Sequence, residues 1–465
     1  MSIYHLPVAI IGAGITGLSA AWELQQNYPG QSYIVLESSN RPGGKVISKK
    51  LTGPHTIIDG GPESFVTRKP EVWDLAHELN IENQIIVPAS ETAGMNVLVD
   101  GKIYSIPLHP IKFMRSELLS PRGKLRLLAE PFIKAKRDYD DETLADFVRR
   151  RLGDEMLQKL IGPVLGGIYN ADPDKQSILY TSPVMREMER EHGGLFRGTL
   201  AKMRQKKKSP VEKKPSFIAF KNGAQTLVDA LVAQLTGEIR LNSRVEHIRQ
   251  ASQGYQISLS NGDSLIAGGV ILATPARAAA GMLERIAPDA SAEFASLPQS
   301  SLGTIALLYR TKDLPDSDIK GLMIPRREKR MIDAIQFTSE RMPGRTEDNY
   351  TLIRVFFGGA YPDMVTFDDQ TRLHHVRTEL QDLLNITAEP VHHEHFCWHE
   401  SYPQANVGHL SKVDAIEALL PETIALAGAS YRGLGVPDCV RQGRDAAQHI
   451  MNAIQALPEL VAVPV

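Results

Sequence analysis

The chain opens with the feature that most constrains its fold, an apolar run that meets three glycines and continues with a helical pattern. In PVAIIGAGITGLSAAWELQQNYPGQSYIVLES, the spacing GxGxxG falls at Gly12, Gly14 and Gly17, and a second apolar run ends at the acidic Glu37. Strand, glycine turn, helix and strand in this order predict a Rossmann-type unit that holds a dinucleotide pyrophosphate at the helix N-terminus. Glu37 is then expected to accept hydrogen bonds from ribose hydroxyls. A glycine turn without a ligand is the alternative, and the agreement of spacing and acid disfavours it.

The residues after Glu37 distinguish between two dinucleotides. ESSNRPGGKV supplies Arg41 and the pair Gly43-Gly44, and DGGPESF supplies a second glycine pair, Gly60-Gly61. Glycine pairs let the backbone approach a ligand closely, and an extended cofactor with a bulky isoalloxazine needs such contacts beyond the first βαβ unit. A plain NAD domain would continue as βαβ instead. The sequence therefore predicts FAD.

Composition limits the remaining possibilities. A chain of 465 residues with 42% hydrophobic and 23% charged residues is long enough for two or three domains, and a formal net charge of -2 gives no reason to expect a nucleic-acid partner. Cys397 and Cys439 have no metal-binding or disulfide spacing, so neither a metal nor a disulfide framework is expected. No apolar run approaches the roughly 20 residues of a membrane span. A cytoplasmic protein, at most peripheral to a membrane, is the expectation.

The three motifs AIIGAGITGLSAAWEL, LESSNRPGGKV and DGGPESF resemble the flavin amine-oxidase superfamily. LADFVRRRLGDEMLQKLIGPVLGGIYNADPDKQSI, HESYPQANVGHL and LAGASYRGLGVPDCVRQGRDAA resemble, within it, the Gram-positive type of porphyrinogen oxidase that acts on coproporphyrinogen III, and the resemblance spans nearly the whole chain. It implies an α/β fold with a discontinuous Rossmann-like FAD-binding domain, an α+β substrate domain and an all-helical insert. The expected boundaries are 1–55, 216–296 and 397–465 for the FAD-binding domain, 56–97 and 297–396 for the substrate-binding domain, and 98–215 for the insert, with a lysine-rich loop near 202–214.

The resemblance also extends the expected cofactor site. It implies that the strand carrying Val245 lies over the adenine, that Trp398 lies by the flavin, and that a helix starting near Pro437 points its N-terminus at the ring, where it would stabilise negative charge on the reduced flavin. The flavin is expected to be non-covalent, because the cysteine that tethers it in some amine oxidases has no match in GASYRGLG. The expected cofactor-binding residues are Gly12, Gly14, Ile15, Thr16, Gly17, Glu37, Ser38, Arg41, Gly43, Gly44, Lys45, Gly60, Gly61, Pro62, Glu63, Ser64, Val245, Ala273, Thr274, Trp398, Gly428, Gly435, Val436 and Pro437.

The implied reaction is an oxygen-dependent, six-electron dehydrogenation of coproporphyrinogen III to coproporphyrin III in haem biosynthesis, with hydrogen peroxide as by-product and protoporphyrinogen IX as a second substrate. Flavin N5 carries the chemistry, so no catalytic side chain is expected. Arg68 and Lys69, directly after the second glycine pair, are expected to hold a substrate propionate, and Ile168 and Tyr169 to form an opposite apolar wall. Alternatively, the basic pair simply starts the helix KPEVWDLAHELN as a solvated face.

Two other functions stay open at this stage. A flavin amine oxidase acting on polyamines or amino acids would need aromatic residues caging an amine, for which Tyr431 is a candidate, and a non-catalytic flavoprotein would show no turnover. The lysine-rich tract is expected to be solvated surface, with contact to anionic lipid or to another enzyme of haem synthesis as the alternative. His393 and His395 alternate along a strand-like segment and would share one face, but no metal is predicted there.

Overall fold

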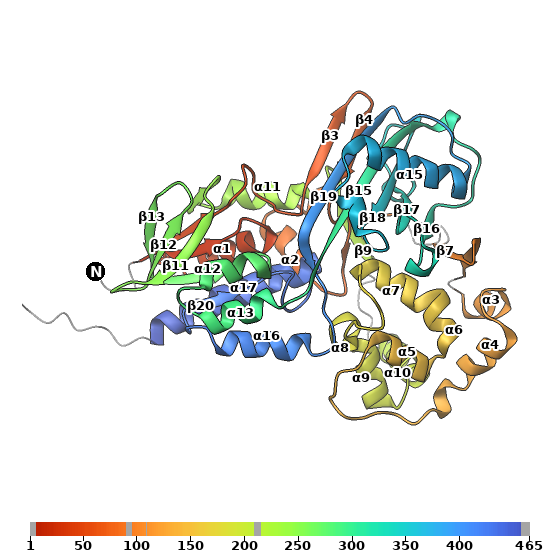
Figure 1. Ribbon diagram of the computed structural model, residues 1–465, viewed down its shortest axis with the longest axis horizontal. Helices are drawn as coiled ribbons and strands as arrows, with labels where there is room; N and C mark the ends of the chain where they lie inside the picture. The colour runs from red at the N-terminus through yellow and green to blue at the C-terminus, as the bar shows by residue number, and fades with distance from the viewer. Residues whose placement is uncertain (1–5, 90–94, 108, 209–214, 457–465) are drawn as a thin grey trace, which may run out of the picture.

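The computed structural model describes residues 6–89, 95–107, 109–208 and 215–456. Figure 1 shows three parts: a layered α/β part that contains both ends of the described chain, a large sheet above its far end, and a group of helices below that sheet. Within these residues, no helix is long and apolar enough to cross a lipid bilayer.

The first part is built on a parallel sheet with the strand order β10-β2-β1-β14-β20. Its strands are short and almost entirely apolar, as parallel strands covered on both faces usually are. They are β1 (Val8–Ile11), β2 (Tyr33–Leu36), β10 (Glu238–Arg240), β14 (Gly269–Leu272) and β20 (Ile424–Leu426). Alternate residues of β1 enter two separate hydrophobic cores, Val8 and Ile10 in one and Ala9 and Ile11 in the other.

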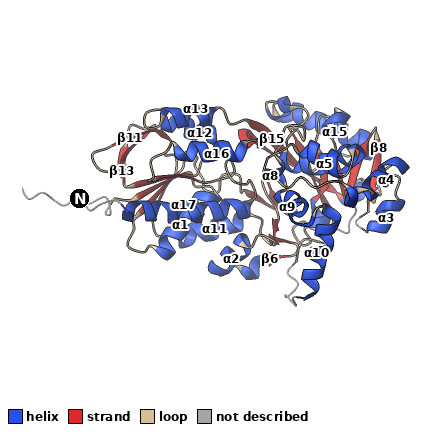
Figure 2. Ribbon diagram, turned by 90° about the horizontal axis from the view of Figure 1, so that it is seen from below, coloured by secondary structure: helices blue, strands red, loops and turns tan. Residues whose placement is uncertain are grey.

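The two cores lie under two different layers, which Figure 2 shows on opposite sides of this sheet. The helices on one side are α1 (Ile15–Asn27), α11 (Gln225–Gln234) and α17 (Val436–Ala456). The other side carries an antiparallel sheet of β11 (Val245–Gln250), β12 (Tyr255–Leu259) and β13 (Ser264–Ala267), and the helices α12 (Ala276–Leu283), α13 (Pro288–Ala295) and α16 (His409–Ala418). The carboxyl ends of β1, β14 and β20 therefore meet at one edge between helical layers, where open α/β sheets bind their ligands.

The second part is a seven-stranded sheet with the order β19-β15-β18-β17-β16-β7-β8. Its strands are β7 (Met95–Val99), β8 (Lys102–Ile106), β15 (Gln299–Arg310), β16 (Gly321–Met323), β17 (Ala334–Phe337), β18 (Tyr350–Phe357) and β19 (His392–Pro403), accompanied by α14 (Thr338–Arg341) and α15 (Asp369–Leu384). The elements that join it to the first part are β3 (Ser48–Thr52), β4 (His55–Asp59), β5 (Phe65–Val66), β6 (Ile85–Ile86), β9 (Phe217–Phe220) and α2 (Glu71–Glu78).

The third part is helical. It consists of α3 (Pro110–Arg115), α4 (Pro121–Leu128), α5 (Leu144–Arg151), α6 (Asp154–Met156), a π-helical turn at Leu157–Ile161, α7 (Gly162–Tyr169), α8 (Ile178–Thr181), α9 (Pro183–His192) and α10 (Leu195–Lys208). Side-chain oxygens cap several of these helices: Ser120 accepts from the Gly123 N–H, and Thr143 accepts from the Asp146 N–H. Such caps satisfy N–H groups that a short helix leaves without a partner.

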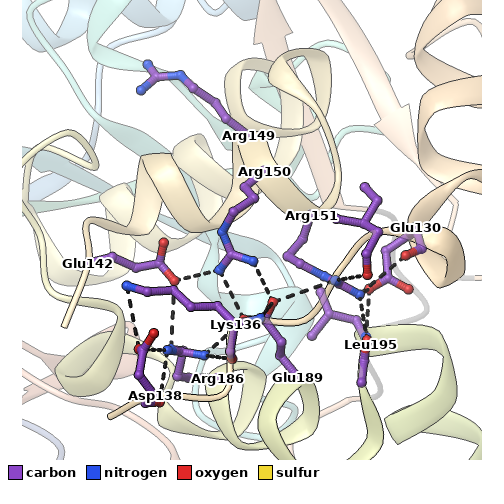
Figure 3. A network of polar contacts seen from close by, with 12 residues as sticks. Glu130, Lys136, Asp138, Glu142, Arg149, Arg150, Arg151, Arg186, Glu189 and Leu195 are labelled. Carbon is purple, nitrogen blue, oxygen red and sulfur yellow. Dashed lines mark hydrogen bonds and ion pairs between the residues drawn. The ribbon is translucent and has the colours of Figure 1, made fainter. Parts of the chain in front are cut away.

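A buried ion network holds the helices of the third part together (Figure 3). Glu189 accepts hydrogen bonds from Arg150 at 2.5 Å and from Arg186 at 3.1 Å, and Arg151 pairs with Glu130. Burial alone would raise the pKa of Glu189, but the hydrogen bonds, first of all from Arg150, outweigh burial and lower it. The network therefore stays charged, and removing Glu189 would leave Arg150 with Glu142 and Arg186 with Asp138 as their close partners.

The observed sheet boundaries differ from the predicted domain boundaries at two places. Residues 95–106 form the hairpin β7–β8 at the edge of the seven-stranded sheet, so that sheet continues past residue 97 and the insert is not helical from residue 98. The reason is the Asp100-Gly101 turn, where both residues have positive φ, as a tight hairpin requires. Strand β19 keeps the chain in the sheet to Pro403, beyond residue 396.

The lysine-rich tract also differs from the expectation in its first half. Helix α10 continues to Lys208, so the predicted loop near 202–214 begins as helix, while residues 209–214 lie outside the described part of the chain. Alanine, lysine, methionine and glutamine all have high helix propensity, which explains why the helix persists through a strongly basic segment.

Candidate cofactor and substrate site

The turn between β1 and α1, called the cradle below, has the backbone geometry expected of the predicted pyrophosphate site. Gly12 has φ +107°, and a Cβ built on it would lie 2.7 Å from the carbonyl oxygen of Ala273. A Cβ on Gly17 would lie 1.9 Å from the carbonyl oxygen of Gly12, so only glycine allows the helix to pack this close to the turn. A Cβ on Gly14 would meet nothing within 4 Å, and Gly14 is the N-cap of α1 with no side-chain cap. The first N–H groups of α1, including those of Ile15 and Thr16, therefore begin at an open backbone surface, which fits the predicted anion site.

Glu37 lies at the mouth of this turn. One of its carboxylate oxygens accepts the Ala13 N–H at 2.9 Å, and the other accepts the Ser39 N–H at 2.8 Å. Its backbone carbonyl accepts the Ser243 N–H at 2.7 Å, which brings the segment leading to Val245 beside it. The position agrees with a carboxylate that holds a ribose, with the start of β11 next to the base. Ser38 is exposed beside it, its hydroxyl 3.3 Å from the carboxylate.

The first additional glycine pair folds against the same turn. The Gly43 N–H donates to the Ala13 carbonyl at 2.7 Å, and the Arg41 guanidinium donates to the Gly44 carbonyl at 2.6 Å. Burial lowers the pKa of Arg41, and the Glu37 carboxylate partly opposes this effect. Burial also lowers the pKa of Lys45. The segment from Arg41 to Lys45 is thus fixed by the cradle and lies alongside it.

The second pair, Gly60-Gly61, is held from the seven-stranded sheet. Arg354 of β18 donates to both carbonyl oxygens, each at 2.6 Å, and the Thr304 hydroxyl donates to the Gly60 carbonyl at 3.0 Å. A Cβ on Gly61 would lie 1.9 Å from the Lys45 carbonyl oxygen, so the two glycine-containing segments cross in contact. The sequence prediction that both pairs belong to one site agrees with this geometry.

Three arginines that sequence reasoning missed fix the stretch DGGPES. Arg345 pairs with Asp59 at 2.6 Å, Arg354 lies 3.5 Å from Glu63, and Arg341 donates to the Ser64 hydroxyl at 3.0 Å. Burial lowers the pKa of Arg354, and the nearby acids oppose that. One signal was available in the sequence: Arg354 interrupts the apolar run TLIRVFF, and a charged residue within a buried strand needs a partner. Pro62, between the pair and Glu63, is half-buried in the same stretch.

Helix α17 places a second helix N-terminus beside the first. A Cβ on Gly443 would lie 2.2 Å from the Thr16 carbonyl oxygen, so α1 and α17 are in backbone contact. The Gln442 side chain accepts from the N–H groups of Gly428 at 3.4 Å and Arg432 at 3.2 Å, which shapes the loop before α17. Within this loop and the first turn, Gly435 is half-buried, and Val436 and Pro437 are buried.

Other predicted cofactor residues lie around this edge. Ala273 donates its N–H to the Ile11 carbonyl at 2.9 Å, and its neighbour Thr274 has a buried hydroxyl without a hydrogen-bond partner. An orphaned hydroxyl at the carboxyl end of β14 fits a site for a polar ligand. Trp398 is half-buried on β19, and its ring is stacked on Phe396 at 12° with the centroids 6.3 Å apart. The flavin contact of Trp398 stays a prediction.

The predicted substrate residues do not share one environment. The Lys69 Nζ lies 2.6 Å from both carboxylate oxygens of Asp438, in the first turn of α17, whereas Arg68 is exposed. Among the residues that the structure describes, no carboxylate forms an ion pair with Arg68. The structure thus differs from the expectation that both cations are free to bind substrate. Ile168 lies in α7, and its side chain falls outside the described part of the structure.

Tyr169 of the insert lies in the same region as Arg68. Burial raises the pKa of the Tyr169 phenol, the Asp438 charge adds to that, and the Arg68 charge opposes it. The Tyr169 hydroxyl donates to the Thr181 carbonyl at 2.8 Å, and its ring meets Tyr180 edge-on with centroids 6.3 Å apart. The Tyr180 hydroxyl donates to the Ala429 carbonyl at 3.2 Å, so this aromatic pair of the insert contacts the loop before α17.

Tyr431, the candidate for an aromatic cage around an amine, does not lie on an open aromatic surface. It is buried, its hydroxyl donates to the Thr274 carbonyl at 3.2 Å, and its ring packs edge-on against Phe294 in the core. It is thus a core residue rather than part of an aromatic cage. Cys439 is also buried, and burial raises the pKa of its thiol to about 11.

The histidine-rich strand behaves as its alternation predicts. His393 and His395 share one face of β19, with ring nitrogens 3.0 Å apart. Burial lowers the pKa of His395 to about 4. Over the described ranges, no three side chains of metal-binding type are grouped as an ion would require.

Comparisons with known proteins agree over almost the full length. The family of flavin-containing amine oxidoreductases matches residues 15–451. Coproporphyrinogen III oxidases from Staphylococcus aureus and Bacillus subtilis are each 32% identical, and both alignments cover 96% of this chain and 98% of the relative. A crystal structure of a protein from Exiguobacterium superimposes with a TM-score of 0.83 at 25% identity, covering 96% of this chain and 98% of that one.

Proposed function

The chain belongs to the flavin-containing amine oxidoreductase family, and from this membership we propose that it is an FAD-dependent oxidase of porphyrinogens. The proposed reaction converts coproporphyrinogen III and three dioxygen molecules to coproporphyrin III and three hydrogen peroxide molecules, so six electrons leave the macrocycle. Protoporphyrinogen IX is proposed as a second substrate. The names of the two 32% identical relatives support this substrate class. The observation that carries it is Arg68, which follows the second glycine segment and is exposed, so that its charge is available to an anionic substrate.

The residues present fit FAD. The cradle at Gly12–Gly17 and the orphaned Thr274 hydroxyl suit a pyrophosphate-containing ligand, and Glu37 suits its ribose. When bound, FAD would supply hydride acceptance from a meso carbon and electron transfer to dioxygen. We propose that it is held without a covalent bond, by the cradle, by the segment from Arg41 to Lys45, and by the backbone of the turn at Gly60-Gly61.

Substrate binding is proposed to depend on Arg68 and on the insert. An exposed guanidinium can hold a propionate with two parallel hydrogen bonds and can steer an anionic substrate to the site. The ring of Tyr169 offers an apolar wall for the macrocycle. No side chain is proposed to act as general acid or base, so the protein's contribution is to position the substrate and to exclude water.

The position of Tyr431 bears on the amine-oxidase alternative. A cage for a neutral amine requires aromatic faces that open into the site, whereas the Tyr431 ring lies in the core with its hydroxyl on the Thr274 carbonyl. This geometry favours the porphyrinogen oxidase over an amine oxidase.

One assay tests the proposal. The purified protein, loaded with FAD, is incubated aerobically with coproporphyrinogen III, protoporphyrinogen IX and a polyamine panel, while porphyrin fluorescence and hydrogen peroxide are recorded. We expect porphyrin from the porphyrinogens with three peroxides for each porphyrin, and no peroxide from the amines. Peroxide only with amines would identify an amine oxidase, and bound flavin without any turnover would identify a non-catalytic flavoprotein.

We further propose that helix α10 contacts an anionic membrane surface. Phe196, Leu200 and Met203 recur at helical spacing and are 40%, 54% and 57% exposed, and the exposed cations Lys202 and Arg204 follow on the same helix. Apolar residues that project beside cations suit an anionic lipid surface. Co-sedimentation with vesicles containing anionic lipid should fall when Leu200 and Met203 are changed to Gln. Unchanged sedimentation would show that these residues do not bind a membrane. Binding of the same helix to another enzyme of haem synthesis would instead identify it as a protein-binding surface.

A further inference from the structure

A buried carboxylate in the first turn of α17 packs against the loop that leads into this helix. Asp438 is in the first turn of the helix, its side chain is 12% exposed, and Lys69 contacts both of its oxygens at 2.6 Å. A Cβ on Gly433 would lie 2.8 Å from the Asp438 carboxyl carbon, and one on Gly435 would lie 3.0 Å from its Oδ2. The carboxylate thus rests on the glycine loop, directly at the end of the helix that is expected to face the flavin.

This carboxylate has two opposite effects. A negative charge in the first turn stabilises α17, because the N-terminus of a helix carries about half a positive elementary charge. The same negative charge cancels that positive potential for any ligand in front of the helix. A reduced flavin, which gains negative charge at the pyrimidine end of its ring, would be destabilised by an unpaired carboxylate at this place.

Lys69 neutralises the Asp438 carboxylate, so the helix N-terminus keeps its positive potential toward a ligand. The second cation near Asp438, Arg441, lies 3.9 Å away and also faces Asp445 at 3.1 Å, so Lys69 is the partner in direct contact. Lys69 comes from the segment that follows Gly60-Gly61, so the pair also ties the second glycine segment to α17. Two parts of the predicted flavin site, far apart in the sequence, are joined by this one bond.

We propose that Lys69 is a positioning residue that neutralises Asp438 at the N-terminus of α17 and so keeps the bound flavin easy to reduce, rather than a residue that binds substrate. The proposal rests on the proposed function only for the place of the flavin beside α17. It does not depend on which molecule the protein oxidises, because the reduction potential of the bound flavin is measured without substrate.

The experiment is a double-mutant cycle on the flavin-loaded protein, with the reduction potential measured by dye equilibration and flavin absorbance. Lys69→Gln should lower the midpoint potential by about 30 mV, which is a tenfold shift in the two-electron reduction equilibrium. Asp438→Asn should shift it in the opposite direction, and the double variant should return near the wild-type value. Lys412→Gln is the matched control, because Lys412 pairs with Glu293 at 3.3 Å and is 36% exposed, against 40% for Lys69.

Each outcome decides the proposal. A normal potential in Lys69→Gln with flavin retained would overturn it, and so would equal shifts in Lys69→Gln and the control. If Lys69→Gln loses flavin and the double variant regains it, the unpaired charge is the cause and the proposal is supported. If Lys69→Gln and the double variant both lose flavin, the ion pair serves only to hold the two segments together and the proposal is wrong.

Discussion

Replacing Gly443 by alanine tests how far the site depends on the contact between α1 and α17. The added Cβ would lie 2.2 Å from the Thr16 carbonyl oxygen and 3.1 Å from the Ala20 nitrogen, both of them backbone atoms that cannot swing away. Reaching an ordinary contact distance would require the helices to separate by about 1 Å. Overpacking of this kind costs about 1–3 kcal/mol, whereas alanine gains about 1 kcal/mol over glycine inside a helix.

Gly281→Ala separates these two contributions. Gly281 lies in the last turn of α12, is exposed, and has nothing within 4 Å of an added Cβ, so it should show only the gain in helix propensity. The difference in unfolding free energy between the two variants, from denaturant titration of the flavin-free proteins, should therefore be about 1–3 kcal/mol, with Gly443→Ala the less stable.

Flavin binding gives the functional half of this test. Because α1 carries the proposed pyrophosphate cradle, a displaced α1 should weaken flavin binding by about tenfold or more, and each 1.4 kcal/mol corresponds to a factor of ten. Titration followed by flavin fluorescence measures this change. If Gly443→Ala gained as much stability as Gly281→Ala and bound flavin as tightly as the wild type, the close helix contact would not be what positions the cradle.

Three further predictions concern the substrate region, the sheet and the insert. Arg68→Ala should raise KM for coproporphyrinogen III about tenfold with kcat and flavin content little changed, because the charge serves ground state and transition state alike; a fall in kcat alone would contradict this. His395 has a folded-state pKa of about 4 and an ordinary value near 6.5 when unfolded, so its stabilising effect is complete above pH 6.5 and is lost as pH falls toward 4. His395→Gln should accordingly lose less Tm than the wild type between pH 7.5 and 5, while the exposed His399→Gln should follow the wild type. Glu189→Gln should destabilise the insert by about 1–3 kcal/mol in urea titrations, since Arg150 and Arg186 would lose a fully buried acid and keep only Glu142 and Asp138 as close partners; a change below about 0.5 kcal/mol would show that the network relaxes or takes up water.

The sequence predicted the local structure of the proposed site where the signals lie close together in the chain. Strand, glycine turn, helix and acid all fall between Val8 and Glu37, and each residue there has its role from its immediate neighbours. The same holds for the start of α17, where a glycine loop precedes a long amphipathic helix that has Pro437 in its first turn. When a backbone conformation is set by residues close together in the chain, the residue types that it requires can be recognised in a single sequence.

The parts that the sequence did not predict depend on partners far along the chain. Arg354 binds the carbonyls of Gly60 and Gly61 nearly 300 residues away, and nothing near DGGPES indicates which cations will reach it. The hairpin at residues 95–106 is a different case, since its Asp100-Gly101 turn is a recognised local signal that the helical interpretation of the region overlooked.

The basic pair Arg68-Lys69 shows why adjacency in the sequence is weak evidence for a shared role. Two neighbouring cations after a cofactor motif predict one anionic ligand for both. In the folded chain, however, Lys69 has its Nζ on the Asp438 carboxylate, while Arg68 is exposed. The two substitutions should therefore be separable: Arg68→Ala should change KM at a normal flavin potential, and Lys69→Gln should change the potential even when no substrate is present. If both variants changed only KM, the two cations would form one substrate site, and the ion pair with Asp438 would have no effect on the flavin.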